Sequence, residues 1–182
     1  MLFRSDAEDL TYERVARLLR MLDGDAVSTF SGTAGFEEFS ARVEPHSPGL
    51  RDRIWYGAGS PRSTQWAAEQ GLNLLTSNIL KPDESDLERD GRWDFAAIQQ
   101  RQIALFKAHH PDGDAARVSQ GLVVIPTDSA TAEQKAKYEA FVAKRTPRTA
   151  APAEAPASGA LAAPDVLGTS EEIVEKLYAD AA

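Results

Sequence analysis

The segment RIWYGAGSPRSTQWAAEQGLNLLTS, residues 53–77, contains the signals for a strand, a turn, a helix and a second strand. Its first apolar run is rich in β-forming residues and stops at residues 57–59, Gly-Ala-Gly, because glycine adopts backbone angles that other residues avoid. Ser60 is a good helix N-cap, Pro61 suits the first helical position, and Gly71 suits the end of the helix. A second short apolar run follows, so the segment predicts a βαβ unit.

The turn before this helix has the features of a phosphate-binding site. Gly59 would let the backbone approach an anion closely, and the first amides of a helix, together with its dipole, favour negative charge. We expect the amides of Arg62, Ser63 and Thr64 to be unpaired, with the hydroxyls of Ser60 and Ser63 beside them. The same residues also suit an ordinary turn and cap, so the local pattern leaves both interpretations open.

Two polar residues follow the second strand of this unit. Ser77 and Asn78 would lie at the carboxyl end of that strand, next to the turn at residues 57–63. Ligands of α/β proteins bind at this edge of the sheet. A polar loop start explains Ser77 and Asn78 equally well on the sequence alone.

The remaining chain adds helices on both sides of the central unit. Apolar spacing and capping residues predict helices that begin at Asp9 or Thr11, Asp94, Thr131 and Thr169. The side chains that we expect to face a core include Leu18, Phe141, Val142, Val174 and Leu177. Residues 26–43 predict a hairpin or an irregular excursion, residues 81–92 a charged loop, and residues 146–164 a long Ala/Pro-rich loop.

A third core strand is expected at residues 118–125. Its apolar run, Leu122–Ile125, lacks the alternation of a half-exposed strand and is typical of a parallel sheet covered on both faces. Strands that alternate with helices predict an α/β fold with a parallel sheet. The strands near residues 53, 72 and 118 are too few to close a barrel, but they suit part of one.

Composition narrows the class of protein. The 182 residues suit one domain, and a net charge of −8 argues against nucleic acid as a partner. No apolar stretch approaches the length of a membrane span, and zero cysteines exclude disulfides and thiolate metal sites. We therefore expect a cytoplasmic protein without a membrane or metal partner. Residues 1–5, MLFRS, read like a translated sequencing adapter, so we expect an artefactual leader before a domain of residues 6–182.

Other chemistry is poorly supported by the sequence. His109 and His110 are consecutive and point in different directions, so they cannot chelate as an i,i+4 pair. Asp112 and Asp114 lack the spacing of a calcium loop, and no Gly-x-Ser-x-Gly elbow is present. No catalytic acid–base pair can be assigned, so the catalytic residues stay unknown.

The central unit resembles a known family. Residues 43–79, VEPHSPGLRDRIWYGAGSPRSTQWAAEQGLNLLTSNI, look like the middle of bacterial-luciferase-like, flavin-dependent monooxygenases. The segment GTSEEIVEKL, residues 168–177, resembles a late helix of the same family. Trp-Ala-Ala-x-x-Gly-Leu, residues 66–72, makes the resemblance fairly specific.

The resemblance implies a partial TIM (β/α)8 barrel, roughly its second half, with the cofactor at the carboxyl ends of the strands. It implies reduced FMN, or in some branches a deazaflavin coenzyme. Carried over, Gly59, Ser60 and Ser63 would contact the flavin phosphate, while Ser77 and Asn78 would approach the flavin from the next strand. The implied partners are a small-molecule substrate and flavin, which a reductase can supply, and the parent is expected to be a homo-oligomer.

Three functions follow as expectations. The first is a fragment of a monooxygenase that uses reduced FMN and O2 to oxidise a small organic substrate. The others are a deazaflavin-dependent oxidoreductase that transfers hydride, and a non-catalytic half-barrel that binds phosphate. Since the earlier barrel strands have no counterpart here, we expect activity from the intact parent and not from this chain alone.

Overall fold

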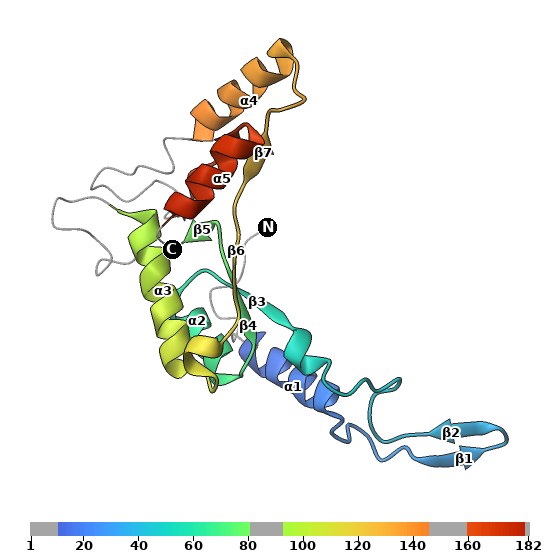
Figure 1. Cartoon of the computed structure of the whole chain (residues 1–182). Helices are drawn as coiled ribbons and strands as arrows, with labels where there is room; N and C mark the ends of the chain where they lie inside the picture. The colour runs from blue at the N-terminus through green and yellow to red at the C-terminus, as the bar shows by residue number, and fades with distance from the viewer. Residues whose placement is uncertain (1–10, 81–92, 146–159, 181–182) are drawn as a thin grey trace, which may run out of the picture. The chain divides into compact units, whose positions relative to one another are not determined.

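The computed structural model describes residues 11–80, 93–145 and 160–180 (Figure 1). The chain divides into two compact units, Met1–Ile54 and Trp55–Ala182. The predictions for residues 1–5, 81–92 and 146–159 lie outside the described residues, and the single domain expected for residues 6–182 stays a prediction. No helix of the described part is both long and apolar enough to cross a membrane.

The first unit begins with helix α1 (Thr11–Asp23). Gly24 follows it with φ 92°, a left-handed angle that glycine adopts at low cost. Leu19 is buried, while Leu18, which was expected to face a core, is 49% exposed. The helix therefore buries a narrower apolar stripe than its sequence predicts.

A β-hairpin follows α1, where the sequence predicted a hairpin or an irregular excursion. Strands β1 (Gly32–Ala34) and β2 (Glu37–Phe39) pair antiparallel. The rings of Phe30 and Phe39 lie 4.7 Å apart between their centroids. The short 3-10 helix η1 (Arg51–Arg53) ends the unit, and an ion pair joins Arg51 to Asp23 at the end of α1.

The second unit begins with the predicted βαβ segment. It consists of β3 (Trp55–Ala58), α2 (Pro61–Glu69) and β4 (Asn73–Thr76), and the two strands are parallel. Gly71 has φ 66° after the last turn of α2. The βαβ prediction is confirmed.

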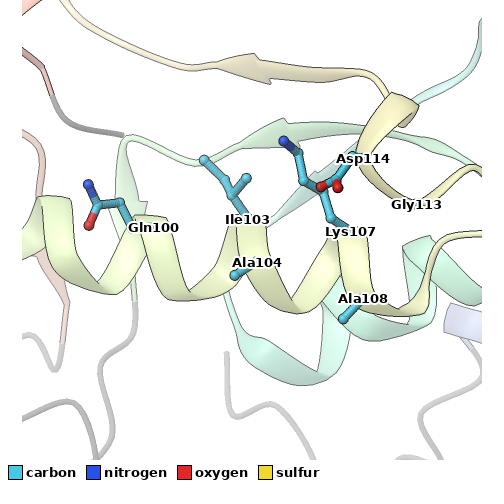
Figure 2. Close-up of a pocket in the computed structure, with 7 residues that line it drawn as sticks. All are labelled: Gln100, Ile103, Ala104, Lys107, Ala108, Gly113 and Asp114. Carbon is cyan, nitrogen blue, oxygen red and sulfur yellow. The ribbon is translucent and has the colours of Figure 1, made fainter.

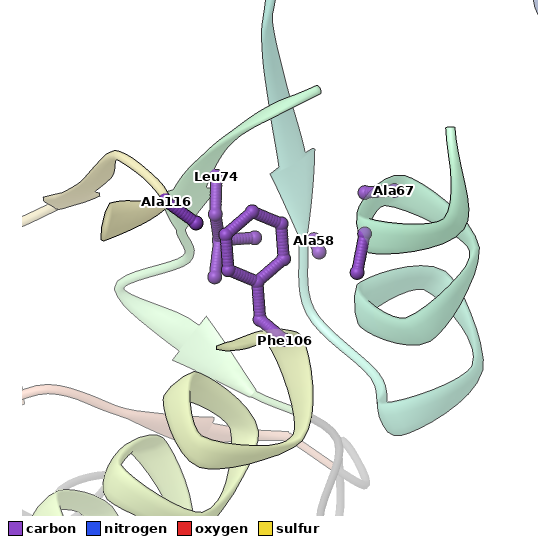
Figure 3. Packing of buried hydrophobic residues seen from close by; sticks show 6 residues of the cluster. Ala58, Ala67, Leu74, Phe106 and Ala116 are labelled. Carbon is purple, nitrogen blue, oxygen red and sulfur yellow. The ribbon is translucent and has the colours of Figure 1, made fainter. Parts of the chain in front are cut away.

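Strand β6 (Val118–Gln120) pairs in parallel with β4, which gives a three-stranded sheet of order β3-β4-β6. Helix α3 (Phe95–His109) and the 3-10 helix η3 (Gly113–Ala115) connect β4 to β6, and the Asp94 side chain caps α3. A small hydrophobic core lies between this sheet and the helices (Figure 3). Its buried members are Ala58, Ala67, Ala68, Leu74, Phe106 and Ala116.

Only one face of this sheet is covered in the described part. Ala58 and Leu74 are each 1% exposed, whereas Trp55 and Leu75 on the other face are 38% and 40% exposed. The prediction of a sheet covered on both faces is therefore wrong for the described residues. Parallel strands that alternate with helices are confirmed.

The strand predicted at residues 118–125 is two strands. Strand β6 ends at Gln120, and β7 (Val124–Pro126) pairs in parallel with β9 (Val166–Gly168) instead of continuing the first sheet. Gly121 lies at the break, where its amide donates a hydrogen bond to the carbonyl oxygen of Thr76 at 3.2 Å. Val124 in β7 is exposed and is not part of a buried sheet.

Strands β5 (Ile79–Leu80) and β8 (Leu161–Ala162) form an antiparallel pair. The sequence predicted loop at residues 161–162, so this part of the Ala/Pro-rich loop is corrected. Burial explains the difference, because Leu161 packs in a second core cluster. The buried residues of that cluster are Leu80, Phe95, Ile98, Leu161 and Ala163.

Helices α4 (Ala132–Arg145) and α5 (Ser170–Ala179) lie next to β9 in the second unit. The capping boxes predicted at Thr131 and Thr169 are both present. The core faces are narrower than predicted, since α4 buries no residue and α5 buries only Ile173. The predicted core residues Phe141, Val174 and Leu177 are exposed.

Candidate functional site

The carboxyl ends of β3 and β4 bring the predicted site residues together. The parallel register pairs Ala58 with Thr76, so Gly59 and Ser77 leave the sheet side by side. A Cβ atom built on Gly59 would lie 3.7 Å from the Cβ of Ser77 and 3.4 Å from the carbonyl oxygen of Ile79. The glycine thus permits close approach of the two loops at the edge where α/β proteins bind ligands.

Ser60 and Ser63 form a reciprocal capping box at the start of α2. The Ser63 amide donates to Ser60 Oγ at 3.3 Å, and the Ser60 amide donates to Ser63 Oγ at 3.2 Å. The Thr64 amide donates to the Ser60 carbonyl at 3.0 Å. The amides of Ser63 and Thr64 are therefore not unpaired, and that prediction is wrong, because the cap satisfies the donors that an uncapped helix would offer.

The two hydroxyl groups still retain donor capacity toward a ligand. Ser60 Oγ and Ser63 Oγ are 2.9 Å apart, and Ser63 Oγ is also 2.9 Å from the Ser60 carbonyl oxygen. Each hydroxyl has one proton. When Ser63 donates its proton to the Ser60 carbonyl oxygen, the proton of Ser60 can rotate toward an anion without loss of either amide bond. The pair can thus offer one outward donor while the cap stays intact.

Ser77 and Asn78 are held in place by the backbone of neighbouring elements. Ser77 Oγ accepts a hydrogen bond from the Ile79 amide at 3.0 Å, which leaves its proton available. The Asn78 carbonyl accepts from the Ala163 amide at 2.8 Å. The Asn78 side chain makes no hydrogen bond with another described residue, and it is half-buried. Both residues therefore present polar groups at this edge from a fixed backbone.

The sheet face beside this edge is open at Gly57. A Cβ built on Gly57 would meet no atom within 4 Å. Gly57 and Leu75 lie opposite each other in the register, on the exposed face of the sheet. Space over glycine, a helix N-terminus with a positive dipole end and hydroxyl donors are the features that suit a phosphate group. The residues present fit an anionic cofactor end at Gly59, Ser60 and Ser63.

A polar network that the sequence analysis missed lies behind the same edge. Buried Gln99 of α3 donates to Thr76 Oγ1 at 3.0 Å and accepts from Gln120 Nε2 at 2.7 Å. Gln120 Nε2 also lies 3.0 Å from Asp180 Oδ2. Thr76 and Gln120 are partners in the register and point to the helix-covered face. The network therefore ties the strand ends to α3 and to the end of α5, and its sequence signal is a single glutamine, Gln99, on the apolar face of α3.

A groove of about 550 Å³ lies elsewhere, along α3 and η3 (Figure 2). Its lining residues are Gln100, Ile103, Ala104, Lys107, Ala108, Gly113 and Asp114. Helix η3 leads into the amino end of β6, so the part of this groove at η3 lies at the other end of the strands from the predicted site. It does not include any predicted site residue.

The histidines at the end of α3 have local roles. His109 Nδ1 lies 2.9 Å from the Leu105 carbonyl oxygen, and the Asp112 amide donates to His110 Nδ1 at 3.0 Å. Within the described ranges, no cluster of three His, Cys, Asp or Glu side chains has the arrangement of a metal site. His109 and His110 therefore act as helix-end residues.

Comparison with protein families shows to which family the chain belongs. A family model described as luciferase-like monooxygenase matches residues 5–181. The chain belongs to the luciferase-like monooxygenase family. A comparison with curated proteins found no match. Membership in the luciferase-like monooxygenases indicates an oxidoreductase of monooxygenase type, and members of this family generally use a reduced flavin.

Proposed function

We propose that the chain is part of a flavin-dependent monooxygenase that uses reduced FMN and O2 to oxidise a small organic substrate. The phosphate of FMN would bind at Gly59, Ser60 and Ser63, and Ser77 and Asn78 would approach the flavin from the next strand. The observation that carries this proposal is the approach of the two strand ends, where a Cβ built on Gly59 would lie 3.7 Å from the Cβ of Ser77. Reduced flavin supplies the electrons for oxygen activation when it is bound.

The residues of this chain would bind and orient the cofactor. The Ser60 hydroxyl would donate its outward proton to a phosphate oxygen, and the dipole of α2 would favour the negative charge. The Ser77 hydroxyl, held by the Ile79 amide, would donate a second hydrogen bond from β4. Neither role requires a titratable side chain, which agrees with the lack of a catalytic acid–base pair.

The exposed face of the β3-β4-β6 sheet supports part of a barrel. Parallel sheets occur almost only where both faces are covered. Trp55 and Leu75 are large apolar residues on the uncovered face, and inward-pointing residues of this kind fill the interior of a TIM barrel. We therefore propose that this face is the interior of a barrel that further strands complete, and that activity needs the intact parent. A cytoplasmic location and flavin supplied by a reductase belong to the same proposal.

Titration of FMN and of riboflavin into the purified chain and its variants tests the phosphate site. Ser60→Ala and Ser63→Ala should each weaken FMN binding by about 0.5–3 kcal/mol, because hydrogen bonds to a charged group have this magnitude. Riboflavin, which lacks the phosphate, should bind both variants as it binds the wild type. The proposal is wrong if FMN binds both variants with unchanged affinity.

The capping box of α5 offers a matched control. Thr169→Ala removes the same kind of N-cap from a helix away from the strand edge, since Thr169 accepts from the Glu172 amide at 3.3 Å. Its stability should fall as in Ser60→Ala, while its affinity for FMN should stay unchanged. Loss of FMN binding in Thr169→Ala would mean that lost stability, and not a lost phosphate contact, explains the effect.

The cofactor branch needs a second measurement. On the intact parent, oxygen consumption with reduced FMN is expected, and hydride transfer with a reduced deazaflavin coenzyme is the alternative. If only the deazaflavin coenzyme reacts, the proposed phosphate site stands and the monooxygenase assignment is wrong. Binding of FMN without either reaction would favour the non-catalytic half-barrel.

A further inference from the structure

A chain of buried side-chain hydrogen bonds connects α3 to the carboxyl end of β4. Gln99 of α3 is 0% exposed, and its Nε2 donates a hydrogen bond to Thr76 Oγ1 at 3.0 Å. Its Oε1 accepts a hydrogen bond from Gln120 Nε2 at 2.7 Å. Both polar atoms of the Gln99 side chain are therefore paired, as a buried amide requires. We call Gln99, Gln120 and Thr76 the amide relay.

The hydrogen bonds of the amide relay run in one direction. Gln120 Nε2 also donates to Asp180 Oδ2 at 3.0 Å, and because a carboxylate oxygen can only accept, the group of Gln120 at this place must be its NH2 group. The same NH2 group donates to Gln99 Oε1, which leaves the NH2 group of Gln99 for Thr76. The orientation of the Gln99 amide is thus fixed by its partners on both sides.

Thr76, the last residue of β4, is held from two directions. Gln99 donates to its side chain, and the Gly121 amide donates to its carbonyl oxygen at 3.2 Å. That carbonyl belongs to the planar peptide unit that joins Thr76 to Ser77. A Cβ built on Gly59 would lie only 3.7 Å from the Ser77 Cβ, so a rotation of this peptide unit would displace Ser77 relative to the turn before α2.

We propose that Gln99 is a positioning residue of the flavin site. It acts through Thr76: its amide fixes the peptide unit between Thr76 and Ser77, and this unit presents Ser77 and Asn78 to the flavin. Gln99 does not reach the flavin itself, because its side chain is fully buried. This role rests on the flavin site proposed above, whereas its effect on the end of β4 can be measured without flavin.

Amide hydrogen exchange of the full chain, followed by NMR, tests the effect on the end of β4. Gln99→Leu removes both hydrogen bonds of the amide, so the Gly121 amide, which donates to the Thr76 carbonyl, should exchange about 10-fold faster. The Leu74 amide is the internal reference, because it donates to the Arg117 carbonyl at 3.0 Å at the other end of the same strand pair. A general loss of stability raises both exchange rates alike, whereas loss of positioning raises mainly the rate of Gly121.

Two further variants isolate the hydrogen bond to Thr76. Gln102→Leu makes the same substitution one turn further along α3, where the side chain is 4% exposed and its Nε2 has no hydrogen-bond partner in the described part of the chain. This control should leave the ratio of the Gly121 and Leu74 rates as in the wild type. Thr76→Val should raise the ratio as Gln99→Leu does, and because both changes break the same bond, the double variant should add little.

Titration of the same variants with FMN and with riboflavin tests the consequence for the cofactor. Gln99→Leu should weaken the binding of both flavins by about 3- to 10-fold, which is the effect of one hydrogen bond lost to the ligand. Gln102→Leu should bind both flavins as the wild type does. A lost phosphate contact, as expected for Ser60→Ala, would weaken the binding of FMN alone, so the two effects can be distinguished.

The outcomes separate this role from the proposed function. An unchanged ratio of the Gly121 and Leu74 exchange rates in Gln99→Leu would overturn the positioning role, and so would unchanged affinity for both flavins. A wild type that binds neither flavin would overturn the proposed function, and the exchange rates would still decide whether Gln99 fixes the end of β4.

Discussion

Gly121 lies directly against the carboxyl end of the neighbouring strand. A Cβ atom built on Gly121 would come within 2.7 Å of the carbonyl oxygen of Thr76, which is closer than real Cβ contacts. The same carbonyl accepts the Gly121 amide at 3.2 Å. Only glycine lets the chain pass the end of β4 at this distance, and Gly121 is the residue that directly follows β6.

Gly121→Ala should therefore destabilise the second unit. The added methyl group meets backbone and not a flexible side chain, so the strand ends must shift, and such overpacking costs about 1–3 kcal/mol. Urea unfolding measures the loss. Gly57→Ala is the matched control, because its Cβ would meet no atom within 4 Å and Gly57 has no positive φ. Equal stability of the two variants would contradict the role of Gly121.

The sequence predicted most elements of the fold but not where apolar runs are buried. Local signals sufficed for the βαβ unit and for the capped starts of α3 and α5, because these depend on residues close in the chain. The run 122–125 looked like one buried strand, yet the break at Gly121 depends on Thr76, which is distant in sequence. Residues 161–162 looked like loop because their pairing partner, β5, is equally distant.

In the candidate site, too, features set by neighbouring residues were predictable, whereas contacts between distant residues were not. Ser60 and Ser63 were predictable as a pair from the S-x-x-S spacing around Pro61, but their capping geometry could not be distinguished from an open phosphate cradle. The approach of Ser77 to Gly59 followed from the parallel sheet. Gln99 and Gln120 were not predictable, because a hydrogen bond between a helix and a strand leaves no periodic pattern in the sequence.

The Ser60 and Ser63 substitutions should not be additive for stability. Loss of a serine N-cap costs about 0.5–2 kcal/mol, and each serine supports the other through reciprocal bonds. Removing either side chain already breaks the reciprocal hydrogen bonds. The double alanine variant should therefore unfold at nearly the same urea concentration as the less stable of the two single variants. A loss equal to the sum of both single losses would show that the hydroxyl groups act independently.

Asp128 should make stability depend on pH at acidic values. Its carboxylate accepts from the Ser170 amide at 3.0 and 3.1 Å and from the Ser170 hydroxyl at 2.8 Å. The backbone bond, followed by the hydroxyl bond, lowers the pKa of Asp128 from its ordinary value of 3.8. A lowered folded pKa gives stability that is present above 3.8 and lost as pH falls through the folded pKa.

Urea midpoints of the wild type and Asp128→Asn, measured from neutral to acidic pH, test this linkage. The wild type should be the more stable protein at neutral pH, and the difference should shrink as pH falls below 3.8. Asp114→Asn is a control at an exposed aspartate without an ion pair in the described part. A difference that stays constant across the acidic range would show that charge on Asp128 does not stabilise the start of α5.

The positive charge of Arg145 should be required to stabilise the buried carboxylate of Asp165. Its Nε lies 2.7 Å from Asp165 Oδ2, and the Asp165 side chain is 1% exposed. Arg145→Met leaves that carboxylate buried without its partner, and such changes cost about 3–5 kcal/mol. The double variant Arg145→Met with Asp165→Val also removes the negative charge of Asp165. It should be more stable than Arg145→Met in urea unfolding, because an apolar pair can replace a buried ion pair. If the double variant is the less stable protein, the cost arises from lost packing of the arginine side chain on Phe141, whose ring centroid lies 5.3 Å from the guanidinium carbon.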